Sequence, residues 1–277
     1  MIHRTLVAGL VCLGLNTGTI GAAESHASQK ADFHAFVNWD FRYRKKLKGW
    51  QATATAIQKT IEQWYPRRPT HTVAENGTPE SLRRFLYSLP KQADCDLSIV
   101  YLASHQSPEG EWDFVQKKLQ SIPMIAAESD IPKHSGRIVI VDACFAAALH
   151  QDPGWNRALQ SSTLFASSAS EETKELDFRS PHPIDLRRRY PAATAWLDRQ
   201  LGKDWDGRLS FLGFVWVQTF VTSAVAPTDQ KGWSEFLRRC EATAEKFRRD
   251  ADKRLASRIL FSPSSDSPHP HSERSLR

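Results

Sequence analysis

Two apolar segments decide the fold of this chain: Leu97-Ser98-Ile99-Val100-Tyr101-Leu102 and Arg137-Ile138-Val139-Ile140-Val141. Short runs of nearly continuous aliphatic residues are typical of strands that are buried on both faces, as in a parallel sheet. A reactive residue follows each strand, His105 after the first and Cys144 after the second. Because ligands bind at the carboxyl ends of parallel strands, these residues are expected to meet there although they are far apart in the sequence. The pattern predicts a candidate cysteine-hydrolase dyad.

The composition is that of an ordinary globular protein. The chain has 277 residues, of which 40% are hydrophobic and 25% charged, enough for one large domain or two small ones. Its net charge of +6 is spread over short basic clusters, the densest at Arg42–Lys48 and Arg187–Arg189. No nucleic-acid motif accompanies them, so we interpret them as solvated surface and expect no nucleic-acid partner. His269 and His271 alone do not make a metal site, and no metal or cofactor is expected.

The first 27 residues are interpreted as a cleaved export signal. A short positive start precedes an apolar run, Thr5–Leu15, and small polar residues follow it up to Ala27. The apolar run is too short to span a bilayer, so no stable membrane insertion is expected once the signal is removed. We therefore predict an exported protein, periplasmic or secreted. Its folded domain is expected over residues 28–261 and a disordered tail rich in Ser and Pro over 262–277.

Removal of the signal leaves three cysteines: Cys95, Cys144 and Cys240. An odd number in an exported protein means that at least one thiol is unpaired within the chain. Catalysis by Cys144, with Cys95 and Cys240 either free or paired with each other, would account for it. The alternative is three buried thiols that pack as small apolar side chains.

Strand and helix patterns alternate along the chain. Further strands are expected over 33–39, 71–74 and 162–168, and helices over 50–64, 79–89, 114–122, 211–220 and 233–255. Thr78 is predicted to cap the helix that begins with Pro79. No clear sheet signal exists over 179–207, and residues 171–175 form an acidic loop. This alternation predicts an α/β fold, a three-layer sandwich with a mostly parallel sheet and helices on both faces.

The residues at the two strand ends suit acyl transfer. A thiol attacks an acyl carbon as thiolate, and the predicted helix opening at 145–150 would favour that form at Cys144 by its partial positive charge. His105 would act as general base and later protonate the leaving amine. Backbone N–H groups, including that of Cys144, would hold the oxyanion, and the small Ala143 would let the substrate backbone approach closely.

Two segments, Val100–Gly110 and Val139–Phe145, resemble the caspase-like clan of cysteine peptidases, and Ser104–Gly110 is most similar to bacterial members of the legumain-like family. The resemblance covers roughly residues 33–222. It implies a caspase-like sandwich and an endopeptidase that hydrolyses peptide or protein substrates through Cys144, His105 and a thioester acyl-enzyme. The oligomeric state stays open.

The same resemblance suggests a substrate pocket beside the strand over 162–168. Ser167 and Ser168, at the end of that strand, are expected to border the pocket. Glu171 and its acidic neighbours are expected either to select a basic residue before the cleaved bond or to form a solvated loop. The second interpretation is favoured, because runs of charge are usually solvated.

The sequence departs from the family pattern in the supports of the dyad. The family has Gly after the catalytic His, where this chain has Gln106, and Ser-Gly two residues beyond the Cys, where it has Ala146-Ala147. We assign Gln106, Asp142 and Ala143 to the support of the oxyanion or of the turn; Asp142 orients the turn or caps the next helix and is not a third catalytic residue. A catalytically inactive caspase-like domain that binds or scaffolds is the main alternative, and a transamidase is a third.

Overall fold

The computed structural model describes residues 29–38, 48–65, 71–75, 77–114, 118–159, 164–168, 175–180, 185–223, 225–250 and 259–262. The predicted export signal, residues 1–27, lies outside this part of the chain, as does the predicted tail from residue 263 onward. Ser262, which we expected in the tail, instead ends a strand.

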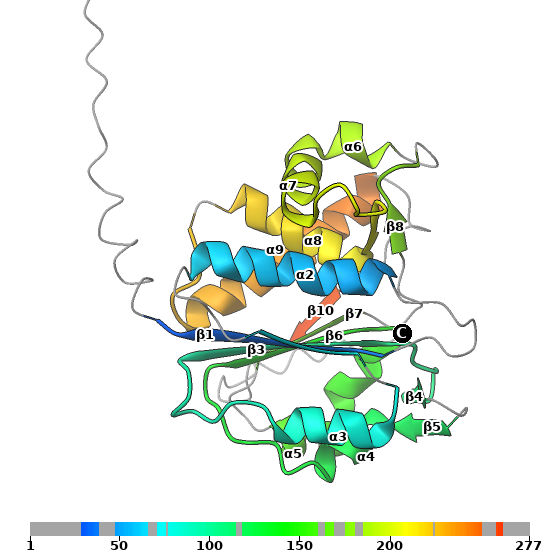
Figure 1. Cartoon of the computed structure of the whole chain (residues 1–277), viewed down its shortest axis with the longest axis vertical. Coiled ribbons are helices and arrows are strands. Elements are labelled where there is room, and N and C mark those ends of the chain that lie inside the picture. Colours follow the sequence, from blue (N-terminus) through cyan, green and yellow to red (C-terminus); the bar gives the residue numbers. More distant parts are fainter. Residues whose placement is uncertain are drawn as a thin grey trace, which may run out of the picture.

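A six-stranded sheet lies at the centre, in the order β10–β7–β6–β3–β1–β2 (Figure 1). Its strands are β1 (Ala31–Val37), β2 (His71–Glu75), β3 (Leu97–Ser104), β6 (Arg137–Ala143), β7 (Leu164–Ser168) and β10 (Ile259–Ser262). All neighbouring strands are parallel except β10, which runs antiparallel to β7. Strands β1, β3 and β6 are buried along their whole length, which confirms the mostly parallel sheet covered on both faces.

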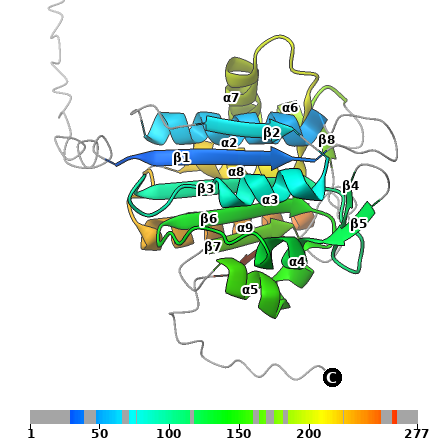
Figure 2. The ribbon, with the colours of Figure 1, turned by 60° about the horizontal axis from the view of Figure 1, so that its bottom comes forward.

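Helices cover both faces of the sheet and complete the three predicted layers (Figure 1). One face carries α2 (Lys48–Trp64), α7 (Pro191–Leu201), α8 (Phe211–Thr222) and α9 (Gln230–Asp250), with α6 (Leu186–Arg189) beyond α7. The other carries α3 (Pro79–Tyr87), α4 (Ile122–Ala127) and α5 (Pro153–Leu159). Figure 2 shows β1, β3, β6 and β7 side by side with these last three helices in front.

Alternate residues of each central strand enter different cores. Tyr101 and Ile140 belong to the core beneath α2 and α8, which we call the α2-side core. Val100 and Val141 belong to the core beneath α3 and α4, the α3-side core. This alternation follows from the two-residue period of a strand. It also determines which face of the sheet the first residue beyond each strand points to.

The helix starts follow local sequence signals. Thr78 caps α3 as predicted: its hydroxyl accepts a hydrogen bond from the Ser81 backbone N–H at 3.1 Å, and Pro79 occupies the first turn. The strongly apolar α8 is buried over most of its surface, as its composition predicts.

The helix predicted over 114–122 is wrong. The segment forms an antiparallel hairpin of β4 (Glu111–Phe114) and β5 (Lys118–Ser121), and α4 begins only at Ile122. Trp112 and Phe114 lie two residues apart and both enter the α3-side core, which is the period of a strand. Pro123 then fixes the first turn of α4.

The region over 175–210 also differs from expectation. Two short strands, β8 (Glu175–Asp177) and β9 (Arg208–Ser210), pair antiparallel, and Glu175, expected in an acidic loop, begins β8. The helices α6 and α7 lie between them. Within the basic cluster of α6, Arg187 donates to both carboxylate oxygens of Asp198 at 2.8 and 3.1 Å. This arginine therefore holds α6 against α7.

Candidate active site

His105 and Cys144 leave neighbouring strands at the same level. The parallel register of β3 and β6 pairs Ser104 with Ala143, so His105 and Cys144 are the first residues beyond the two strands. Neighbouring strands are about 5 Å apart, which places the two backbones side by side at the carboxyl edge of the sheet.

Both residues continue toward the same face. Tyr101 and Ala103 point into the α2-side core, so the alternation carries His105 to that side, and Ile138 and Ile140 carry Cys144 there in the same way. The ring of His105 contacts the ring of Trp50 in α2, with centroids 6.3 Å apart. This contact agrees with the placement of His105 on the α2 side of the sheet. Cys144 is 8% exposed and His105 is half-buried.

Trp50 touches both strand ends. Its ring lies against His105, and its indole N–H donates to the carbonyl oxygen of Asp142 at 3.1 Å. The sequence pattern identified Trp50 only as one of the apolar positions of α2. No sequence signal distinguishes it from the others, because its contacts depend on where α2 begins relative to the sheet.

Asp142 lies fully buried, two residues before Cys144 and on the same face. The Tyr101 hydroxyl donates to its Oδ2 atom at 2.7 Å. Burial raises the pKa of Asp142 from its ordinary 3.8 to about 6, and hydrogen bonds from neighbouring side chains oppose the rise. Of the two roles expected for Asp142, the cap of the following helix is wrong, because Phe145 holds the cap position and no side chain bonds there. The orientation of the turn stays a prediction.

Gln106 joins the two strand ends from the other face. It is 5% exposed, and its amide Nε2 donates to the carbonyl oxygen of Phe145 at 3.2 Å. Its Oε1 accepts from the indole N–H of Trp112 at 3.1 Å, and an isolated backbone bridge also joins it to Trp112. The side chain therefore links the segments after β3 and β6 to the β4–β5 hairpin.

The turn after Cys144 is left-handed. Phe145 has φ 56° and ψ 17°, and a 3₁₀ helix, Ala146–Gln151, follows. We expected a helix opening directly after Cys144; the turn that forms is 3₁₀, and the α-helix α5 begins only at Pro153. Because this 3₁₀ helix is short, the helix-dipole argument for Cys144 loses most of its force.

Asn38 is another buried residue of this edge that sequence reasoning missed. It follows β1, and its side-chain amide donates to Ser104 Oγ at 3.0 Å and to the Asp113 carbonyl at 2.8 Å. It thereby ties the end of the His105 strand to the β4–β5 hairpin. An Asn after a strand is a common turn residue, so the sequence alone does not indicate this role.

The predicted substrate pocket is only partly within the described residues. Ser167 and Ser168 lie on β7, and the register pairs Ser167 with Val141 of β6, the strand that leads to Cys144. Glu171 lies outside the described residues. Glu175 accepts a hydrogen bond from the Gly49 backbone N–H at the start of α2, at 3.2 Å, and is therefore part of the local structure.

The other two cysteines are free and buried, so the option of a bond between Cys95 and Cys240 is excluded. Cys95 forms a second thiol–imidazole pair, with its Sγ 3.3 Å from His134 Nε2. Burial raises the pKa of each of these thiols to about 12, and it lowers the pKa of His134. Cys95 and His134 are thus both held in their neutral forms, which do not supply a thiolate nucleophile.

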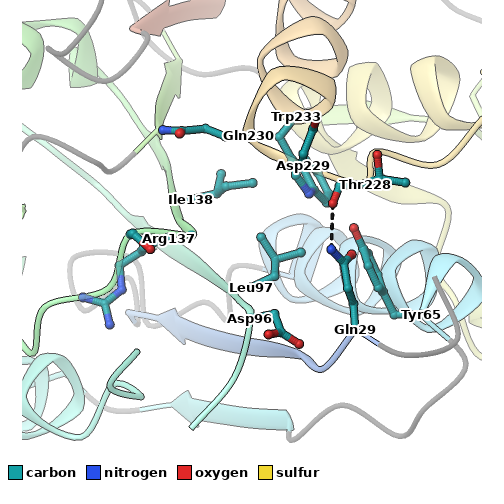
Figure 3. Close-up of a pocket in the computed structure, with 12 residues that line it drawn as sticks. Gln29, Tyr65, Asp96, Leu97, Arg137, Ile138, Thr228, Asp229, Gln230 and Trp233 are labelled. Carbon is teal, nitrogen blue, oxygen red and sulfur yellow. Dashed lines mark hydrogen bonds between the residues drawn. The ribbon is translucent and has the colours of Figure 1, made fainter. Parts of the chain in front are cut away.

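A cavity of about 200 Å³ lies at the opposite edge of the sheet, where β1, β3 and β6 begin (Figure 3). Leu97, Ile138 and Tyr65 contribute to its lining. Gln29 spans part of it and donates to the Thr228 carbonyl at 2.7 Å, and the Tyr65 hydroxyl also donates to a backbone carbonyl. Polar groups of this lining thus bond within the protein, and the cavity is separate from the strand ends that carry His105 and Cys144.

Two features of the described residues bear on metal binding and on membrane insertion. No cluster of three or more His, Cys, Asp or Glu side chains there is arranged to hold a metal ion. Within the same part of the chain, no helix combines the length and the apolar character needed to cross a membrane.

Solved structures with the same architecture are known, whereas sequence comparisons find nothing. No protein-family model matches the chain. No curated protein matches it either. The crystal structure of caspase-1 from Spodoptera frugiperda is 12% identical, with 86% of this chain and 88% of that chain covered and a TM-score of 0.52. The structure of pro-sf-caspase-1 is 10% identical, with 86% and 92% covered and a TM-score of 0.51. The chain therefore has a caspase-like fold.

Proposed function

We propose that this chain is an exported cysteine endopeptidase, most similar to the bacterial legumain-like branch of the caspase-like clan, in which Cys144 is the nucleophile and His105 the general base. The observation that carries the proposal is the register of β3 and β6, which brings the two residues to adjacent strand ends on one face. The caspase-like fold supports it, because the solved neighbours are caspases. Export rests on the character of residues 1–27.

In the proposed reaction, the imidazole of His105 takes the proton of the Cys144 thiol as the sulfur attacks the carbonyl carbon of the scissile peptide bond. Backbone N–H groups, including that of Cys144, hold the oxyanion. The carbon–nitrogen bond then breaks, His105 returns its proton to the leaving amine, and a thioester remains on Cys144. Water, deprotonated by His105, attacks the thioester and releases the acid and the free thiol.

The test compares Cys144→Ala and His105→Ala with the wild-type protein on a peptide library, with self-processing as a second readout. Both variants should lose cleavage, because one lacks the nucleophile and the other the base. A thiol-directed acyl probe should label Cys144 in the folded wild-type protein, as read by mass spectrometry at that residue. Equal activity of the variants and the wild type contradicts the proposal.

The second thiol–imidazole pair supplies the matched controls. Cys95→Ala and His134→Ala remove a pair with similar atoms at the opposite edge of the sheet, and both should retain cleavage. Loss of activity in Cys144→Ala but not in Cys95→Ala assigns the chemistry to the carboxyl edge.

The alternative is a caspase-like domain that binds or scaffolds without catalysis. The buried side chain of Gln106 favours it, because this residue fills the turn after His105 in place of the glycine of the family. Absence of probe labelling at Cys144 in the folded protein, together with no cleavage by the wild type, would support this second function.

A further inference from the structure

Trp50, in the first turn of α2, contacts the ends of both central strands. Its ring lies against His105 beyond β3, and its indole N–H donates to the backbone carbonyl of Asp142 in β6. One rigid side chain therefore connects the segment that carries His105, the candidate base, to the segment that carries Cys144, the candidate nucleophile. The hydrogen bond satisfies the buried indole N–H and fixes the ring at the end of β6, beside His105.

The first turn of α2, which carries Trp50, is itself fixed. Thr53 donates to the Gly49 carbonyl at 2.8 Å, and its hydroxyl lies 2.9 Å from Ser210 Oγ. The Gly49 backbone N–H donates to the Glu175 carboxylate, which fills the space that a side chain at residue 49 would occupy. Trp50 thus projects from backbone that β8 and β9 hold in place, as a positioning residue requires.

We propose that Trp50 is a positioning residue that fixes the imidazole of His105 relative to Cys144. The inference rests on the proposed function, since it needs these two residues to act as base and nucleophile. The indole ring restricts the imidazole from one side, and its N–H fixes the carbonyl two residues before the thiol. A base displaced by about 1 Å loses roughly a hundredfold in rate, so contacts of this kind matter to the reaction without touching the substrate.

The experiment measures alkylation of Cys144 by iodoacetamide as a function of pH, by mass spectrometry at that residue. Cys95 and Cys240 are buried with raised thiol pKa values, so they react slowly. Asp142 of β6, Glu175 of β8 and Arg208 of β9 are titratable or charged groups around this part of α2, and all are retained in each variant. Differences between profiles therefore report on Trp50 and His105.

Wild-type protein should alkylate faster than His105→Ala at about pH 6.5, near the ordinary pKa of imidazole, and equally fast at about pH 10. Trp50→Leu should move the profile toward that of His105→Ala, with roughly a tenfold loss at the lower pH. Trp50→Phe keeps a ring against His105 but lacks the N–H donor, and it should lose about threefold. Trp216→Phe is the matched control, because it removes a buried indole N–H that donates to Thr60 at 2.9 Å, and its profile should equal the wild type.

Each outcome has one meaning. Wild-type profiles for both Trp50 variants overturn the inference while the dyad stands. Identical profiles for wild type and His105→Ala overturn the proposed function and the inference with it. Should Trp50→Leu fail to fold, as read by circular dichroism, the smaller change in Trp50→Phe decides the question.

Discussion

Replacing Asp142 with asparagine tests the buried carboxyl group that lies two residues before Cys144. Burial raises the pKa of this group from 3.8 to about 6. Because the folded-state pKa lies above the unfolded-state value, the folded protein binds the proton more tightly than the unfolded chain. The resulting stabilisation is fully present below the unfolded-state pKa and is lost as the pH rises through about 6.

The size of the effect follows from the two pKa values. At about 1.4 kcal/mol for each tenfold change in proton affinity, the rise to about 6 corresponds to about 3 kcal/mol. Asparagine keeps the shape and does not ionise, so the variant lacks this dependence. An amide N–H group at the position of Oδ1, which accepts no hydrogen bond from the described residues, adds a constant cost of about 1–2 kcal/mol.

The measurement is urea unfolding, followed by tryptophan fluorescence, from about pH 4 to about pH 7.5. The difference between the free energies of unfolding of the two proteins should change by about 2.5 kcal/mol in favour of Asp142→Asn across this range. A difference that stays constant refutes the reasoning. Tyr101→Phe is an informative companion, because loss of the hydroxyl that donates to Asp142 should raise the carboxyl pKa further and move the window to higher pH.

Three other substitutions test the packing around the site and the helices. Gln106→Gly removes the amide that donates to the Phe145 carbonyl and should lower the free energy of unfolding by about 2 kcal/mol. The same variant should slow probe labelling of Cys144, and faster labelling would contradict a supporting role of Gln106. Gly213→Ala places a Cβ 2.6 Å from Thr53 Cγ2 and should destabilise by about 1–3 kcal/mol in thermal melts, so an unchanged Tm would disprove the clash. Thr78→Ala should cost about 1 kcal/mol through loss of the α3 cap, whereas Thr78→Ser should not.

The central sheet was predictable because burial on both faces leaves a strong local signal. The residues of β3 and β6 are aliphatic almost throughout, and both strands are buried along their whole length. Helix α3 was predictable from Thr78 and Pro79, whose effects act within one turn. In these elements the local preference and the tertiary environment agree.

The elements that the sequence did not reveal are short and depend on distant partners. Strand β8 pairs Glu175 with Ser210, and β10 pairs Ile259 with Ser168. Strands of three or four residues carry little periodic signal, so pairing rather than local preference makes them strands. In β4–β5, the alternation of Trp112 and Phe114 indicates a strand. The apolar residues over 114–122 are also spaced as in a helix, and the prediction followed that second pattern.

The candidate dyad and its supports differ in predictability for a geometric reason. His105 and Cys144 could be found because each directly follows a recognisable strand, and parallel strands end at one edge. Trp50 could not, because its position over His105 depends on how α2 crosses the sheet. Asn38 likewise acts through the Asp113 carbonyl of the β4–β5 hairpin, which the sequence pattern did not predict.

Gln106 and Trp50 hold the two strand ends from opposite faces of the sheet. Gln106 bonds the carbonyl of Phe145, a left-handed non-glycine residue whose conformation costs about 1–2 kcal/mol, and that carbonyl also accepts from the Ala148 N–H. A side-chain hydrogen bond therefore maintains a turn that glycine would adopt without strain. On the α2 side of the sheet, Trp50 packs against His105 and donates a hydrogen bond to the Asp142 carbonyl. The two side chains thus restrain the segments that carry His105 and Cys144 from both faces of the sheet, which is the kind of support that the proposed dyad would need in order to stay aligned.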